Sequence, residues 1–293
     1  MKIADLIRLL CLSAIWGASF LFLRIIAPVL GALPTAFFRT LLATLGLMVI
    51  LFVMRQRWDF KGKFGALIAL GVITSSLPFF MFAVAAKVLP AGYSAILNAT
   101  TPLMGVVVGA MFFSEQLTVS KAAGVFVGLV GVVLLTQSGP VAMNASVLLA
   151  IGACLVSTAC YGLGGFLARS WITEKGGLDS KLVALGSQAG AAAALLPVFG
   201  VSLLIQPPVS WGGPSIWLAM AALALICTAF AYILYFRLLA DIGPVRSSTV
   251  TFLIPPFGML WGVLFLNEQL TWAHAAGAGV IGLALWLVLR PTK

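Results

Sequence analysis

Prolines inside long apolar segments stand beside the polar residues that are best suited to bind a small molecule. Proline has no backbone N–H, so within a helix it leaves the carbonyl four residues earlier without its usual donor. Pro102 would free the carbonyl of Asn98, and Pro255 that of Thr251. An unpaired carbonyl is costly in lipid, so it should face protein or a water-filled cavity. We therefore expect helix breaks with a role in gating at Pro78, Pro102, Pro255 and Pro256.

Aromatic and polar side chains at a similar depth extend this predicted site. Trp16, Tyr161 and Tyr232 lie in the middle of apolar segments, where an indole N–H or a phenol O–H needs a partner other than lipid. A cavity lined in this way would suit an apolar or aromatic solute with a small polar head group. The alternative is that the polar groups only join helices by hydrogen bonds. The predicted substrate-binding residues are Trp16, Phe20, Phe79, Asn98, Thr101, Tyr161, Tyr232 and Thr251.

Ionisable side chains are expected away from the helix centres. Glu115 and Glu268 are assigned to the cytoplasmic ends of their helices, and the single histidine, His274, is placed at that end too. No acid is then available at mid-depth to relay a proton or hold a cation, which favours facilitated movement without excluding proton coupling. Arg24 and Arg39 are expected near the outer helix ends, with their side chains extended to the membrane surface. Guidance of a substrate carboxylate is the alternative role for these two arginines.

Residue patterns for covalent or metal chemistry are missing from the apolar segments. A membrane enzyme needs embedded acids, a metal cluster, or a nucleophile with its base. The four cysteines have no metal-like spacing and are expected to be buried free thiols. We therefore predict no enzyme activity, no catalytic residue, no cofactor and no metal site. A channel would need a continuous polar stripe, whereas the polar residues here gather at one depth.

The elements that must position these residues are membrane helices. Of the 293 residues, 62% are hydrophobic and only 8% are charged, against about 25% charged in soluble domains. A bilayer core of about 30 Å needs about 20 apolar residues per helix. The first apolar stretch is taken as a retained helix rather than a cleaved signal peptide. The predicted spans lie near residues 5–26, 34–54, 63–84, 91–113, 119–136, 146–168, 181–200, 214–236, 246–266 and 272–289.

The second half of the chain repeats the first. A shift of 153 residues aligns Pro102 with Pro255, and the Glu-Gln-Leu-Thr run at residues 115–118 with that at residues 268–271. Because each half holds five predicted helices, an odd number, equivalent helices should cross the membrane in opposite directions, as in many secondary transporters. We predict a first five-helix repeat over residues 1–138 and an inverted second repeat over residues 139–293.

Charge and glycine patterns predict orientation and packing. The net charge of +10 is thinly spread, which indicates membrane topology rather than nucleic-acid binding. With the N-terminus in the cytoplasm, twelve Lys and Arg residues are assigned to the cytoplasmic side, and five to the other side: Arg24, Arg39, Lys87, Arg237 and Arg246. Both termini are therefore placed in the cytoplasm. Glycine pairs at four-residue spacing should pack helices within each half, with a dimer interface as the alternative: Gly105/Gly109, Gly124/Gly128 and Gly258/Gly262.

In these motifs the sequence resembles the EamA family of the drug/metabolite transporter superfamily. The likeness is carried by Trp16-Gly17-Ala18-Ser19-Phe20, by Arg39, and by the run from Thr101-Pro102 to Gly128, which recurs in the second half. The glycine that usually precedes the glutamate of this run is replaced by Ser114 and Asn267. The resemblance implies an all-α integral membrane protein of the bacterial inner membrane, with ten transmembrane helices in two inverted five-helix repeats.

The resemblance also implies a function. Members of the family typically export or import amino acids and other small metabolites, and the length and aromatic content are similar to those of the superfamily's aromatic amino-acid exporters. We therefore predict a secondary transporter that exports amino acids, above all aromatic or hydrophobic ones, or related metabolites by alternating access. The alternatives are a metabolite, sugar or drug permease of the same superfamily, and beyond it a channel or a membrane enzyme. The expected partners are a small-molecule substrate and the lipid bilayer, with no nucleic acid and with the chain acting as a monomer.

Overall fold

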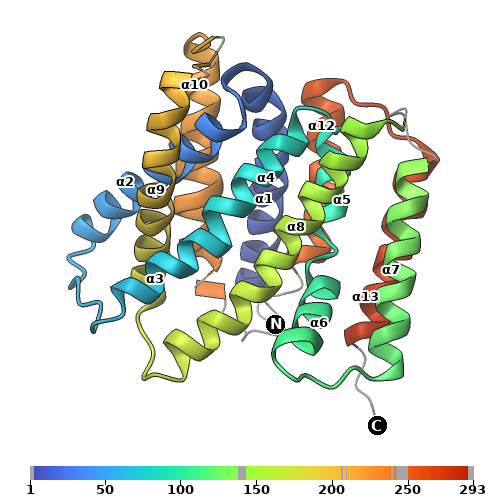
Figure 1. Cartoon of the computed structure of the whole chain (residues 1–293), viewed down its shortest axis with the longest axis horizontal. Coiled ribbons are helices and arrows are strands. Elements are labelled where there is room, and N and C mark those ends of the chain that lie inside the picture. The colour runs from blue at the N-terminus through green and yellow to red at the C-terminus, as the bar shows by residue number, and fades with distance from the viewer. Residues whose placement is uncertain are drawn as a thin grey trace.

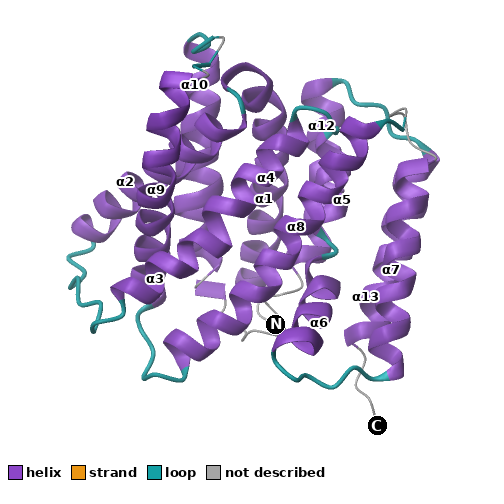
Figure 2. Cartoon of the chain, viewed as in Figure 1, coloured by secondary structure: helices purple, strands orange, loops and turns teal. Residues whose placement is uncertain are grey.

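Long apolar segments form helices because a helix satisfies its own backbone hydrogen bonds, as a chain in lipid requires. The computed structural model describes residues 3–137, 143–205, 207–208, 210–235, 237–238, 241 and 250–289, and every regular element within them is helical (Figure 2). The first elements are α1 (Ile3–Leu30), α2 (Ala32–Val53), α3 (Phe64–Gly71), the π-helical η1 (Val72–Ser76), α4 (Leu77–Ala86), α5 (Ala91–Asn98), α6 (Thr101–Phe112) and α7 (Val119–Gln137). They are followed by α8 (Ala145–Ala168), the π-helical η2 (Arg169–Thr173), α9 (Ser180–Ile205), α10 (Pro214–Ala221), the π-helical η3 (Ala222–Phe230), α12 (Val250–Leu266) and α13 (Trp272–Leu289).

Helical segments lie in each of the ten predicted ranges, as far as those ranges are described. Six helices or continuous helical runs are long and apolar enough to cross a membrane, and the bent pair α5–α6 would make a seventh. Shorter apolar helices occupy three further ranges: Val119–Leu135, Val250–Leu266 and Trp272–Val288. The chain is therefore an all-helical membrane protein with several spans, and the count of ten stays a prediction.

The chain bends where Pro102 was expected to interrupt a helix. Helix α5 ends at Asn98, α6 begins at Thr101 with Pro102 in its first turn, and the two are bent by 40°. The Thr101 hydroxyl donates a hydrogen bond of 2.7 Å to the Asn98 carbonyl. A side chain thus supplies the donor that proline lacks, which lets the bend lie inside the protein.

Pro78 is accommodated by a widened turn. It lies in the first turn of α4, directly after η1, and the Leu77 N–H bonds to the Val72 carbonyl five residues earlier. Such π-helical turns within α-helices are frequently found at functional sites.

The expected interruption at Pro255 and Pro256 is not seen. Helix α12 is one helix from Val250 to Leu266, with both prolines inside it. The proline ring fixes φ near its helical value, so each proline removes one hydrogen bond without ending the helix. The two halves therefore differ here, with a bend in one and a continuous helix in the other.

Glycines pack helices from opposite halves against each other, so the expectation of packing within each half holds only in part, as for Gly128, which meets Leu103 of its own half. A Cβ on Gly17 of α1 would lie 2.9 Å from the Gly258 nitrogen of α12, and a Cβ on Gly162 of α8 would lie 2.8 Å from the Gly105 Cα of α6. A shift of 145 residues relates Gly17 to Gly162, and a shift of 153 relates Gly105 to Gly258. The same close contact therefore occurs twice. The largest buried apolar cluster likewise joins residues of both halves.

Helices α7 and α13 form a pair at one edge of the bundle (Figure 1). A Cβ on Gly124 of α7 would lie 2.8 Å from the Ala284 carbonyl oxygen of α13, and a Cβ on Gly277 of α13 would lie 2.8 Å from the Leu135 Cβ of α7. Small residues let two backbones approach closely. Here too the two helices come from different halves of the chain, α7 from the first and α13 from the second.

The turns that follow α6 and α12 share one geometry. Ser114 and Asn267 adopt left-handed φ values of 53° and 54°, a conformation that glycine adopts most readily. This explains why glycine is usual before the glutamate in the family that the sequence resembles. In both turns the N–H of the following glutamate donates a hydrogen bond to a carbonyl of the preceding helix. The Glu115 N–H bonds to the Gly109 carbonyl at 3.1 Å, and the Glu268 N–H to the Gly262 carbonyl at 3.1 Å.

Glu268 lies at the opposite end of the bundle from Glu115, so the assignment of both to one end is wrong. The Glu268 carboxylate accepts hydrogen bonds from the backbone N–H groups of Ala91 at 2.7 Å and Gly92 at 3.2 Å, at the start of α5. Glu115 instead follows the far end of α6, and Figure 1 shows the α6–α7 and α12–α13 connections at opposite ends. This agrees with the predicted inversion, in which an odd number of crossings separates equivalent turns.

The single histidine shares the location of Glu268. The His274 ring packs edge-on against Tyr93 of α5, with 4.9 Å between ring centroids. His274 therefore also lies at the end opposite Glu115, contrary to its expected place.

Replacing Glu268 with alanine is expected to lower the free energy of unfolding by about 1–2 kcal/mol, because two N–H groups at the start of α5 lose their acceptor. Thermal unfolding of the full chain in detergent would measure this. Glu115→Ala is the matched control, since Glu115 is exposed and its carboxylate accepts no hydrogen bond within the described residues. Equal loss of stability in both variants would contradict the capping role.

An ionic cluster joins the start of α1 to the end of the segment after η3. Arg8 Nη1 lies 3.1 Å from Asp5 and 2.7 Å from Asp241, and Arg237 Nε lies 3.0 Å from Asp241. Arg237 is therefore at the same end as Arg8, not at the opposite end as assigned, and this strengthens the bias of positive charge toward that end. Arg246 lies outside the described residues.

Candidate functional site

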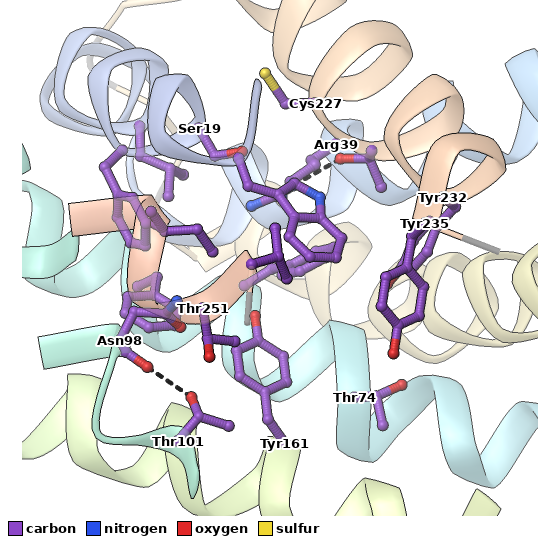
Figure 3. A pocket seen from close by; sticks show the side chains of 18 residues that line it. Ser19, Arg39, Thr74, Asn98, Thr101, Tyr161, Cys227, Tyr232, Tyr235 and Thr251 are labelled. Carbon is purple, nitrogen blue, oxygen red and sulfur yellow. Dashed lines mark hydrogen bonds between the residues drawn. The ribbon is translucent and has the colours of Figure 1, made fainter. Parts of the chain in front are cut away.

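A cavity of about 320 Å³ opens among helices from both halves, and all eight predicted substrate-binding residues line it. Trp16 and Phe20 come from α1, Phe79 from α4, Asn98 from α5, Thr101 from α6, Tyr161 from α8, Tyr232 from the α-helical residues after η3, and Thr251 from α12. Figure 3 shows these elements around one space, with the Tyr161 hydroxyl pointing into it. The volume is at the low end of the range of small-molecule pockets, about 300–1,000 Å³.

One side of the cavity carries neutral polar groups, near the α5–α6 bend. The Thr101 hydroxyl is directed back to the Asn98 carbonyl, as the dashed line in Figure 3 shows. The Asn98 side-chain amide forms no hydrogen bond within the described part of the chain, although Asn98 is only 8% exposed. Its N–H and C=O groups are therefore available to a solute in the cavity.

Aromatic rings form much of the remaining wall. Trp16 packs against Tyr235 with 5.4 Å between ring centroids. Phe82 lies between Phe20, at 5.4 Å, and Tyr161, at 6.2 Å. Contacts at these distances fix the rings relative to one another and leave faces that can pack against an apolar or aromatic solute.

Arg39 lies in this cavity, so its expected extension to the membrane surface is wrong. It stands about two turns from the start of α2 and is only 7% exposed. Its Nε donates a hydrogen bond of 3.0 Å to the Thr228 hydroxyl, and its guanidinium carbon lies 3.7 Å above the centre of the Phe79 ring. Contacts with a hydroxyl and an aromatic face make the buried charge tolerable. Arg39 is the one charged side chain among the described residues that line the cavity.

Five further polar residues of the lining were not predicted: Ser19, Thr74, Cys227, Thr228 and Tyr235. Thr74 belongs to η1, and Thr228 to η3, in equivalent helices of the two halves. The Thr228 hydroxyl donates a hydrogen bond of 2.9 Å to the carbonyl of Leu223, five residues earlier. The wider π turn therefore sets the direction of this side chain. The threonines within apolar runs are the only sequence signal of these turns.

The other arginine considered for a substrate carboxylate, Arg24, lies near an end of the bundle. Arg24 donates a hydrogen bond of 2.8 Å to the Ala86 carbonyl at the end of α4 and lines a second depression with Glu268. It therefore does not share the cavity of Arg39. Among the cysteines, Cys154 and Cys227 are buried free thiols, whereas Cys11 is exposed, against expectation.

Comparison with known proteins gives consistent matches along the whole chain. A family model described as "EamA-like transporter family" matches residues 5–137 and again residues 147–290. An "Uncharacterized transporter" of Archaeoglobus fulgidus is 24% identical over 94% of this chain and 95% of its own length. "Protein PecM" of Dickeya dadantii is 25% identical over 94% of this chain and 88% of its own length. A "Probable amino-acid metabolite efflux pump" of Escherichia coli (strain K12) is 23% identical over 97% of this chain and 94% of its own length. A crystal structure that shares 17% identity covers 99% of this chain and 97% of its own chain, with a TM-score of 0.64, which shows a common fold.

Proposed function

Because the chain belongs to the EamA-like transporter family, we propose that this membrane transporter exports amino acids, above all aromatic or hydrophobic ones, or related metabolites. The observation that carries the proposal is the cavity, where aromatic walls, a neutral amide and one arginine meet between the two halves. An aromatic or aliphatic side chain would pack on the rings, and the polar end of the solute would reach Asn98 and Arg39. The relatives named as amino-acid metabolite efflux pumps support the same substrate class.

The proposed topology has ten spans, with both termini in the cytoplasm and the protein in the bacterial inner membrane. The ionic cluster of Arg8 and Asp241 would then lie on the cytoplasmic side, and the contact of Glu268 with the start of α5 on the outer side. In alternating access, the two contacts would open in turn, because each ties elements of the two halves at one end of the cavity. The α5–α6 bend and the π turns η1 and η3 are the places where the helices can flex.

A monomer is the proposed working unit, since the cavity is formed within one chain. A sugar or drug permease of the same superfamily is the runner-up. The small multidrug type is disfavoured because no acidic side chain is among the described lining residues to bind a cation or proton. A channel or a membrane enzyme stays a remote alternative.

Transport by purified protein in proteoliposomes tests the proposal. We expect saturable flux of phenylalanine, leucine or their derivatives down their own gradient, with little change when a pH gradient is imposed, because the described lining residues include no acid to carry the proton. Empty liposomes and the variant Asn98→Ala are the controls. Flux of sugars or organic cations alone would overturn the substrate class, and non-saturating flux would favour a channel.

A further inference from the structure

Arg39 carries a charge that the protein does not neutralise. All seven acidic residues belong to the described part of the chain, and the ion pairs that they form there do not include Arg39. Arg39 is only 7% exposed. A buried cation without a counter-charge is costly, so an anion that enters the cavity gains from pairing with it.

The contacts of the Arg39 guanidinium leave its two terminal nitrogens, Nη1 and Nη2, available to a ligand. Nε donates its hydrogen bond to the Thr228 hydroxyl at 3.0 Å, and the guanidinium carbon lies 3.7 Å over the centre of the Phe79 ring. Nη1 and Nη2 form no hydrogen bond with the described residues. These two nitrogens form one of the two guanidinium edges that can bind both oxygens of a carboxylate side by side. Arg39, Thr228 and Phe79 therefore form a preorganised carboxylate-binding site on the wall of the cavity.

The cavity offers no matching charge for an ammonium group. The polar lining residues other than Arg39 are neutral: Ser19, Thr74, Asn98, Thr101, Tyr161, Cys227, Thr228, Tyr232, Tyr235 and Thr251. A zwitterion would bring a second charge out of water without an opposite partner, whereas an anion would leave the site neutral overall. The electrostatics thus favour a solute of net charge −1.

We propose that Arg39 binds the carboxylate of the transported molecule, and that the site prefers apolar carboxylates without an ammonium group, such as N-acyl amino acids or 2-oxo acids, over zwitterionic amino acids. This inference rests on the proposed function and narrows its substrate class. Arg39 is the specificity-determining residue, and Thr228 is the residue that positions it.

The test compares three solutes of nearly the same shape: N-acetylphenylalanine, its neutral amide, and phenylalanine. Binding is measured by thermal stabilisation of the full chain in detergent, and transport by counterflow in proteoliposomes. In the unaltered protein we expect the acid to bind about 10- to 100-fold more tightly than the amide, and phenylalanine to fall between them. In Arg39→Gln the difference between acid and amide should shrink to less than about threefold, with binding of the amide unchanged.

Two further variants keep the test decisive if Arg39→Gln does not fold. Arg39→Lys retains the charge but not the two-nitrogen edge, and should lose part of the preference for the acid. Thr228→Val releases Nε and should weaken binding of the acid several-fold while leaving the amide unaffected. If Arg39 had only a structural role, its replacement would instead weaken the binding of the acid and of the amide equally.

The outcomes separate this inference from the proposed function. Equal binding of acid and amide by the unaltered protein, or a preference for the acid that survives Arg39→Gln, would overturn the role of Arg39 while transport itself stands. Tighter binding of phenylalanine than of its N-acetyl form would overturn the preference for net charge −1. If none of the three solutes bound or moved, the proposed function would fall.

Discussion

Replacing Gly162 with alanine is expected to reduce transport to near background and to destabilise the protein by about 1–3 kcal/mol. The new Cβ would lie 2.8 Å from the Gly105 Cα and 2.9 Å from its nitrogen. Both are backbone atoms and cannot rotate away, so α8 and α6 must separate. Tyr161, the residue before Gly162, would then move relative to Asn98 and Thr101 across the cavity. Gly17→Ala should act in the same way, through its contact with Gly258.

Gly165→Ala in the same helix is the matched control. A Cβ at Gly165 meets no atom within 4 Å, and Gly165 is exposed, so this change should be neutral or slightly stabilising through its better helix propensity. Thermal unfolding in detergent and flux in proteoliposomes would be measured for all three variants. Full transport by Gly162→Ala would show that the two helices can part without consequence for the site.

Asn98→Ala and Trp16→Ala are each expected to raise the apparent KM for transport by about tenfold or more, with expression unchanged. Asn98 offers an amide with no hydrogen bond within the described residues, so a solute loses a donor and an acceptor without loss of an internal contact. Trp16 offers a ring face that is fixed against Tyr235, and its removal takes away apolar contact area.

Asn144→Ala separates these effects from a general cost of losing asparagine. The Asn144 side chain accepts a hydrogen bond of 3.0 Å from the Val147 N–H and caps α8. This variant should lower stability by about 1 kcal/mol and leave the apparent KM for transport unchanged. Wild-type kinetics in both Asn98→Ala and Trp16→Ala would remove these residues from the binding site.

The sequence was sufficient to predict eight of the residues that meet in the cavity, because prolines and polar groups within apolar segments have few tolerable locations. Asn98, Thr101 and Thr251 all had to avoid lipid, and the internal repeat placed two of the segments opposite each other. The family is confirmed by the matches to both halves, whereas binding by the eight residues stays a prediction.

Other features depended on tertiary contacts that leave little trace in one sequence. Arg39 resembled a surface arginine by its distance from the helix start, and its burial depends on Thr228 and Phe79, which lie far away in the chain. The π turns depend on which carbonyl accepts each N–H, and composition does not encode that choice. Glu268 was misplaced for a different reason, since the inversion that was predicted already required its turn to lie opposite that of Glu115.

The close packing between halves has a consequence for how the protein is made. While the first half is being synthesised, Gly105 has no Gly162 beside it, and α7 has no α13. The ribosome must deliver the second half before these faces are covered, so lipid or the insertion machinery has to shield them in the interval. A chain that stopped after α7 would be an unfinished bundle rather than a smaller working one.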